Sequence, residues 1–163
     1  MPLPKLYGLD TICLRPFNIF GKGNRYGGAY TTVLSAWMYH TLVDQSVSPY
    51  IEGDGFQTRD FTSVDNVVDA CMLAATSKEQ FKGEAFNIAQ GEAHSLLDCK
   101  EILEKIYNKK FELEKRPDRI GDVRNTLADI SKAKNILGYH PSTNFESQVK
   151  EMADWYREHY DIV

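Results

Sequence analysis

Two arginines lie where their side chains could bind a doubly charged anion. Arg59 follows a glycine turn in "EGDGFQTRDF", and Arg119 lies in "RIGD" with Asp122 close by. A guanidinium group donates in parallel to two oxygens, and each charge-assisted bond contributes about 1.5–3 kcal/mol. Two converging arginines would therefore suit a diphosphate. The alternative is local pairing, of Arg59 with Asp60 and of Arg119 with an acid at 118 or 122, and spacing alone favours it.

Three further side chains offer related chemistry. Asn18 follows the first expected strand, and α/β folds bind ligands at strand ends. Tyr50 has a flat apolar face for a nucleobase, although an aromatic residue in a short strand is more often part of the core. Asp60 and Asp65 could form an acid–base pair, but a turn salt bridge and a helix cap explain these two carboxylates with fewer assumptions.

No metal site or dinucleotide fingerprint is evident. The histidines (40, 94, 140, 159) and cysteines (13, 71, 99) share no spacing typical of metal ligands. The three cysteines lie far apart in the sequence and are odd in number, which favours reduced thiols in a cytosolic protein. The loop "GKGNRYGG" lacks the Gly-x-Gly-x-x-Gly order opening directly into a helix, and no Gly-Lys-Ser/Thr triplet occurs.

The elements that would position these residues alternate between strands and helices. Strands are expected within residues 10–20, ending near Pro16, and in "SPYIEGDG", "FTSV", "GEAFNIAQG" and "KFELEKRP". Helices are expected at 30–43, at 65–76, from 95, before Gly138 and at 145–160. This order predicts the α/β fold class. The continuous apolar character of residues 10–20 predicts a strand covered on both faces.

Local signals predict how several helices begin and end. Ser63 or Asp65 can cap the helix at 65–76, and Ser95 with Asp98 approximates a capping box. Asp129 is expected to cap a helix that ends before Gly138. In the last helix, residues 149, 152 and 156 share one apolar face.

Composition limits the class of protein. At 163 residues the chain is expected to form a single domain, residues 1–163, that buries roughly 70% of its unfolded surface. The net charge of −4 and the scattered basic residues argue against a nucleic-acid partner. No apolar run approaches the roughly 18 residues of a membrane span. The opening "MPLPKLYGLD" does not resemble a secretory signal, so a cytoplasmic location is expected.

Four segments in order carry a family resemblance: "YGLDTICLRPFNIFGKGN", "YIEGDGFQTRDFTSVDNVVDA", "GEAFNIAQGE" and "RIGDVRNTLADISKAKNILGYHP". They resemble the C-terminal half of an NAD-dependent nucleotide-sugar epimerase/dehydratase, an extended short-chain dehydrogenase, and in particular UDP-glucose 4-epimerase-like proteins. The resemblance covers the chain from Leu6 onward. It implies the last strands of a Rossmann-type sheet together with a small mixed α/β region that binds substrate.

The resemblance also implies roles for individual residues. Asn18 in "RPFNIFG" and Arg59 in "QTRDF" match residues that bind the substrate's diphosphate. Arg119 in "RIGD" resembles the second phosphate arginine. Asp122 matches an acid that orients this arginine or the ribose. Tyr50 lies where the family's chain runs alongside the uracil or thymine base.

The family's catalytic and cofactor-binding motifs are not found in this sequence. Members carry a Gly-rich turn for NAD and a Tyr-x-x-x-Lys pair, but none of the nine tyrosines here has a lysine four positions later. Hydride transfer is chemistry that the cofactor carries. The chain alone is therefore expected to bind no NAD and to contain no catalytic residue.

Three hypotheses remain open. The chain is the substrate-binding half of an NAD-dependent epimerase, whether truncated, from a split gene or from a partial reading frame, and it acts with a missing N-terminal half. In complete form it would most readily epimerise carbon 4 of a UDP-sugar, with dehydration of an NDP-hexose as the alternative. Otherwise it is a free-standing nucleotide-sugar-binding module, or a relic that binds nothing. Unpaired strand edges lead us to expect self-association of the isolated chain.

Overall fold

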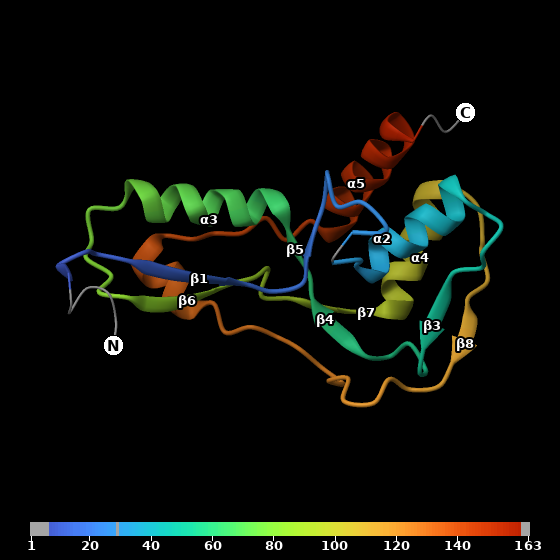
Figure 1. Ribbon diagram of the computed structural model, residues 1–163, viewed down its shortest axis with the longest axis horizontal. Coiled ribbons are helices and arrows are strands. Elements are labelled where there is room, and N and C mark those ends of the chain that lie inside the picture. The colour runs from blue at the N-terminus through green and yellow to red at the C-terminus, as the bar shows by residue number, and fades with distance from the viewer. Residues whose placement is uncertain (1–6, 29, 161–163) are drawn as a thin grey trace. The chain divides into compact units, whose positions relative to one another are not determined.

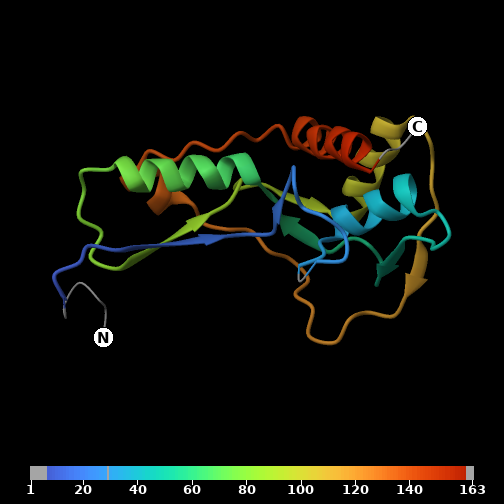
Figure 2. The same ribbon diagram turned by 45° about the horizontal axis from the view of Figure 1, so that its top comes forward.

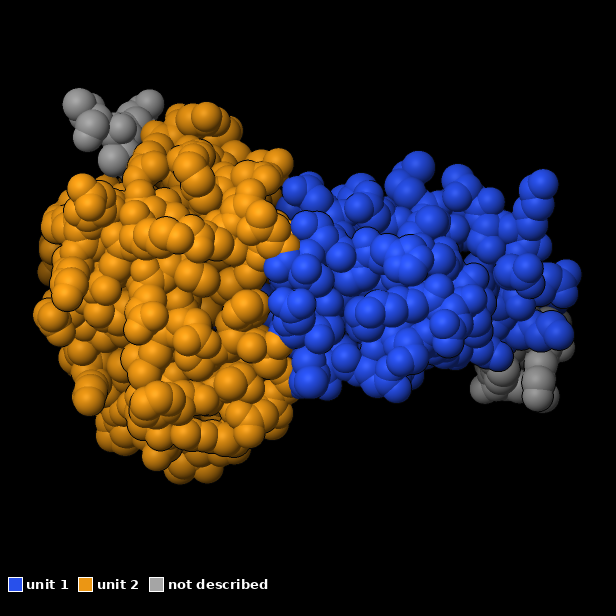
Figure 3. Space-filling view, turned by 180° about the vertical axis from the view of Figure 1, so that it is seen from behind, with its two compact units in different colours: residues 1–19, 60–92, 127–143 blue, residues 20–59, 93–126, 144–163 orange. Residues whose placement is uncertain are grey.

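The computed structural model describes residues 7–28 and 30–160. Within the single domain that the length predicts, the chain forms two compact units, which Figure 3 colours separately. Unit 1 comprises residues 1–19, 60–92 and 127–143, and unit 2 comprises residues 20–59, 93–126 and 144–163. Each unit is assembled from three separate stretches of sequence. The mixture of helices and parallel strands confirms the predicted α/β class.

Unit 1 is built on a parallel strand pair. Strand β1 (Ile12–Pro16) runs alongside β6 (Glu84–Ile88), with Ile12 opposite Glu84 and Pro16 opposite Ile88. Helix α3 (Val64–Thr76) lies along this pair in both ribbon views (Figures 1 and 2). The unit also contains β5 (Thr62–Ser63) and the π-helix η2 (Ala133–Leu137). The core of unit 1 consists of buried residues from α3, β6, η2 and the adjoining loops: Ala70, Phe81, Phe86, Ile88, Ala89, Ala128, Ile130, Ala133, Leu137 and Tyr139.

The helix boundaries of unit 1 follow the local signals. Ser63, one of the two predicted caps, accepts the Asn66 backbone N–H at 3.2 Å. Asp129 accepts the N–H of Ser131 at 2.9 Å, at the start of the helical segment that ends in η2. Gly138 adopts the left-handed conformation after it, as predicted (φ 67°).

The prediction that the first strand is covered on both faces is wrong. Cys13 and Arg15 are exposed, whereas Ile12 and Leu14 are half-buried against the core of unit 1. Among the described residues β1 pairs with β6 alone, and side chains of alternate residues point to opposite faces. One face of β1 is therefore packed and the other is open.

Among its described residues, unit 2 contains three α-helices, a π-helix and several short strands. Their bounds are α2 (Val33–Met38), η1 (Tyr39–Val43, π-helical), α4 (Leu96–Tyr107), α5 (Phe145–His159), β3 (Tyr50–Glu52), β7 (Ala93–Ser95) and β8 (Glu114–Arg116). Strands β2 (Ile19–Phe20) and β4 (Thr58–Asp60) span the sequence boundaries between the units. Strands β3 and β8 are parallel, with Tyr50 opposite Glu114 and Glu52 opposite Arg116.

The helices of unit 2 confirm most of the local predictions. Ser95 and Asp98 form a reciprocal capping box, with N–H···O distances of 3.0 and 2.8 Å. The predicted face of α5, residues 149, 152 and 156, is buried. The helix expected at 30–43 begins only at Val33, where Thr32 caps it, and it continues as a π-helix from Tyr39.

Candidate functional site

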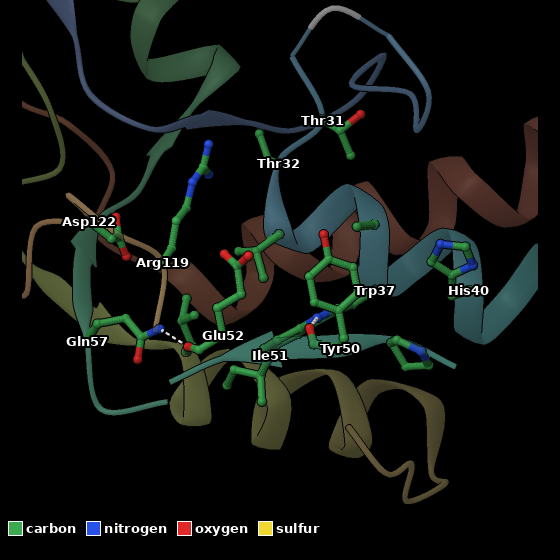
Figure 4. Close-up of a pocket in the computed structure, with 14 residues that line it drawn as sticks. Thr31, Thr32, Trp37, His40, Tyr50, Ile51, Glu52, Gln57, Arg119 and Asp122 are labelled. Carbon is green, nitrogen blue, oxygen red and sulfur yellow. Dashed lines mark hydrogen bonds between the residues drawn. The ribbon is translucent and has the colours of Figure 1, made fainter. Parts of the chain in front are cut away.

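A cavity of about 240 Å³ lies within unit 2, beside α2 and β3 (Figure 4). Its polar lining residues include Thr31, Thr32, His40, Glu52, Gln57, Arg119 and Asp122. Tyr50 and Glu52 point from β3 to the cavity side, as alternate residues of a strand do. Sites for drug-sized ligands usually measure roughly 300–1,000 Å³. The cavity therefore has room for a nucleoside-sized part of a larger ligand.

The glycine turn beside this cavity is shaped by protein packing. Gly53 and Gly55 both have positive φ angles, 78° and 85°. A Cβ atom added to Gly55 would lie 2.8 Å from side-chain carbons of Ile51 and Leu97. The space that the glycine leaves is therefore filled by neighbouring side chains of unit 2, which explains the need for glycine here.

Arg59 is bound to an acid that lies 63 residues further along the chain. Its Nη2 atom donates to both carboxylate oxygens of Asp122 at 2.7 Å, and its Nη1 donates to the Thr58 carbonyl at 2.8 Å. The Arg59 side chain is 15% exposed and that of Asp122 is 41% exposed. This pair fixes the Asp122 carboxylate at the edge of the cavity.

Asp60, the predicted local partner of Arg59, has another role. It is fully buried in unit 1, where its carboxylate accepts the backbone N–H groups of Gln90, Gly91 and Ala128 at 3.0–3.3 Å. An acid enclosed by three backbone donors organises loops. The acid–base pairing of Asp60 with Asp65 that the sequence leaves open is also unsupported, because Asp65 lies exposed in the first turn of α3.

Arg119 presents a guanidinium group to the cavity. Within the described part of the chain it makes no ion pair, in contrast to the predicted alternative of pairing with Asp118 or Asp122. The loop that carries it is tied to the glycine turn by Arg124, which donates to both oxygens of Asp54 at 2.7 and 2.9 Å. This contact also holds the pKa of the Asp54 carboxyl below its usual value.

Tyr50 is an exposed platform and not a core residue. Its side chain is 39% exposed, and the Arg116 guanidinium lies 3.7 Å from its ring centroid. Glu114 in turn accepts two hydrogen bonds from Arg116, at 3.1 and 3.2 Å. The backbone of Tyr50 is anchored because its carbonyl accepts the Trp37 Nε1–H at 2.8 Å. The ring is therefore held from one side while it lines the cavity.

The five predicted site residues are thus distributed unevenly. Tyr50, Arg119 and Asp122 line one cavity, and Arg59 is bonded to Asp122. Asn18 belongs to unit 1, where its amide nitrogen donates to the Asp60 carbonyl at 2.9 Å and its backbone has a positive φ of 32°.

Several lining residues were missed by the sequence reasoning. Gln57 is 7% exposed, and its Nε2 donates to the Glu52 carbonyl at 2.7 Å while its Oε1 has no partner among the described residues. Its place two residues before Arg59 was a usable signal. Glu52, Trp37 and His40 had no such signal, because their types fit an ordinary strand or helix equally well.

Comparison with known proteins identifies the chain's relatives. A profile of the NAD dependent epimerase/dehydratase family matches residues 3–89, more than half of the sequence. The chain belongs to this family. UDP-glucuronate 4-epimerase of Thermodesulfobacterium geofontis is 31% identical over 159 residues, which cover 97% of this chain and 46% of that protein.

Solved structures agree with the family assignment. UDP-N-acetylglucosamine 4-epimerase from Methanobrevibacter ruminantium in complex with UDP-N-acetylmuramic acid matches with a TM-score of 0.85 and 29% identity, covering 95% of this chain and 48% of that one. UDP-glucuronic acid 4-epimerase from Bacillus cereus in complex with UDP-glucuronic acid and NAD matches with a TM-score of 0.82 and 29% identity, covering 96% and 48%. This epimerase-family chain therefore spans about half the length of the relatives that it matches.

The glycine loop between residues 21 and 28 lies in open surroundings. A Cβ atom at Gly23 or Gly27 would meet nothing within 4 Å. The helix that follows, α2, begins at Val33 and has its own side-chain cap from Thr32.

No described group of three or more His, Cys, Asp or Glu side chains is placed to hold a metal ion. The described helices are also too short or too polar to cross a membrane.

Proposed function

We propose that this chain is the nucleotide-sugar-binding half of an NAD-dependent epimerase, and that the complete enzyme epimerises carbon 4 of a UDP-sugar. The observation that carries the proposal is the cavity of unit 2. Its lining includes the guanidinium of Arg119, which forms no ion pair with a described residue, and the exposed ring of Tyr50. The named relatives, which are 4-epimerases of UDP-sugars, support the reaction and the class of substrate.

Each lining group has a place in this proposal. Arg119 donates charge-assisted hydrogen bonds to the diphosphate, and the flat ring of Tyr50 stacks on the base. Asp122, oriented by Arg59, accepts a hydrogen bond from a hydroxyl group of the ribose, so Arg59 acts on the ligand through this acid. Asn18, which belongs to unit 1, stays a predicted phosphate-binding residue from the family resemblance alone. The roles of these residues are proposals from the family resemblance and from the contacts described above.

Catalysis requires groups that this chain does not supply. NAD accepts and returns the hydride in the complete family, and no tyrosine of this sequence has the lysine partner of the acid–base pair. We therefore propose that the isolated chain binds nucleotide sugars without converting them. Its own residues hold and orient the substrate.

Calorimetric titration of the chain with UDP-glucose, UDP-GlcNAc and dTDP-glucose tests the proposal. We expect saturable heat with at least one UDP-sugar, a weaker response to the thymidine compound, and no sugar product after incubation with NAD. Absence of heat with all three ligands would overturn the binding function. Product formation would overturn the proposal that the chain alone is inactive.

We also propose that the isolated chain self-associates through β1. The outer edge of β1 pairs with no described strand, and α3 exposes Val68 and Met72, at 52% and 58%. An open strand edge and exposed apolar side chains each favour association with a second copy, here through the same edge of β1. Light scattering between micromolar and millimolar concentration should show a rising mass, and a monomer at millimolar concentration would contradict it.

A further inference from the structure

A second cavity, of about 420 Å³, lies in unit 2 behind the π-helix η1. Its lining comes from η1, the loop after it, the end of α4, the segment that precedes β8, and α5. We propose that this cavity, which shares His40 and Pro49 with the nucleotide-sugar cavity, binds a small organic anion with a flat apolar body. Its volume lies within the roughly 300–1,000 Å³ that is usual for small-molecule sites.

The charges of the lining favour an anion. Lys109 and Arg157 face the cavity, against one acid, Glu112. Lys109 makes no ion pair with any residue in the described part of the chain. Arg157 donates one hydrogen bond, from Nη1 to Asp154 at 3.1 Å, and the other N–H groups of its guanidinium can bind a ligand. These two cations suit one carboxylate or phosphate group.

Buried polar atoms of the lining also lack protein partners. His40 is only 7% exposed, and its Nδ1 forms no hydrogen bond with a described residue. The Tyr107 hydroxyl forms no hydrogen bond of ordinary geometry with a described residue, and the Thr41 hydroxyl is the nearby group that could accept from it. Burial raises the pKa of Tyr107, so its hydroxyl stays a neutral donor. Buried polar atoms are normally satisfied, so the Nδ1 atom of His40 points to a missing partner.

The remaining lining suits an aromatic or aliphatic body. Leu42, Val47, Pro49 and Phe111 provide apolar surface. The Phe111 ring is fixed by an edge contact with Trp37, at 6.3 Å between centroids. The wall itself is a π-helical turn, a conformation that occurs frequently at functional sites.

The site is tested with 2-naphthoate and, as its uncharged counterpart, 2-naphthylmethanol. Each is titrated into the ¹⁵N-labelled full chain while amide chemical shifts are followed. We expect naphthoate to shift the amides of Thr41, Tyr107 and Phe111, and to bind at least about tenfold more tightly than the alcohol, the value of one ionic hydrogen bond.

Variants distinguish this site from non-specific adsorption. Lys109→Gln should weaken naphthoate binding about tenfold and leave the alcohol unaffected. Lys115→Gln, which removes an exposed lysine of β8 outside the cavity, is the matched control and should bind like the parent chain. Equal affinity for naphthoate and the alcohol, equal effects of the two lysine variants, or shifts confined to residues outside the cavity would each overturn the proposal.

Discussion

Replacing Asp60 with asparagine should strongly destabilise unit 1. The Asp60 side chain is fully buried, and its two oxygens accept backbone N–H groups from two separate loops. Oδ1 accepts from Gln90 at 3.0 Å, Oδ2 accepts from Ala128 at 3.1 Å, and Gly91 is shared between them. These bonds join the segment after β6 to the segment before η2.

The magnitude follows from the bonds that asparagine cannot make. An amide keeps one acceptor oxygen, so one or two of the backbone donors lose their partner and the remaining bond loses its charge. With about 1.5–3 kcal/mol for a hydrogen bond to a charged group, the expected loss is about 2–5 kcal/mol. For a chain of this size that corresponds to a melting temperature lower by about 5–15 °C.

Urea and thermal unfolding, followed by circular dichroism, measure this loss. Asp69→Asn, which changes an exposed carboxylate on α3, is the matched control and should shift stability by no more than about 0.5 kcal/mol. If the Asp60 variant unfolds at the same urea concentration as the control, the backbone hydrogen bonds of this carboxylate do not contribute as described.

Three further predictions concern local chemistry. Asp10 accepts two backbone N–H groups, which lower the pKa of its carboxyl, so its contribution to stability is present above about pH 4 and is lost as the pH falls further. Asp10→Asn should therefore make the urea midpoint less sensitive to acid, and a pH profile like that of the parent chain would contradict this. Cys99 is buried, and burial raises the pKa of its thiol. A thiol reagent should therefore label the two exposed cysteines of the native chain and react with Cys99 only on unfolding. Equal labelling rates for the three cysteines would refute this packing. Gly55→Ala should lower the free energy of unfolding by about 1–3 kcal/mol more than Gly121→Ala, because both glycines have a positive φ but only Gly55 is crowded by neighbouring side chains. Equal urea midpoints of the two variants would argue against that crowding.

Much of the fold was predictable because its signals are local. The caps Ser63 and Ser95 and the terminating Gly138 act within a few residues of where they stand. The buried face of α5 follows from helical spacing alone. The parallel pairing of β1 with β6 agrees with the α/β order of the elements.

The errors arose where distant parts of the chain decide the outcome. The partner of Arg59 lies 63 residues away, so neighbouring acids gave no indication of Asp122. The strand expected in "KFELEKRP" is reduced to Glu114–Arg116, which lies exposed beside β3. The helix at 30–43 changes to π-helical hydrogen bonding at Tyr39, and its apolar spacing does not distinguish the two forms.

The central claim is that Arg119 makes unit 2 a nucleotide-diphosphate site, and calorimetric titration with UDP tests it most directly. Arg119→Gln should weaken UDP binding about 10- to 100-fold, because at least one charge-assisted bond is lost. Arg15→Gln, which removes an exposed arginine of β1, is the matched control and should bind like the parent chain. Equal affinity of the Arg119 variant and the control, or no binding of UDP to the parent chain, would contradict the account.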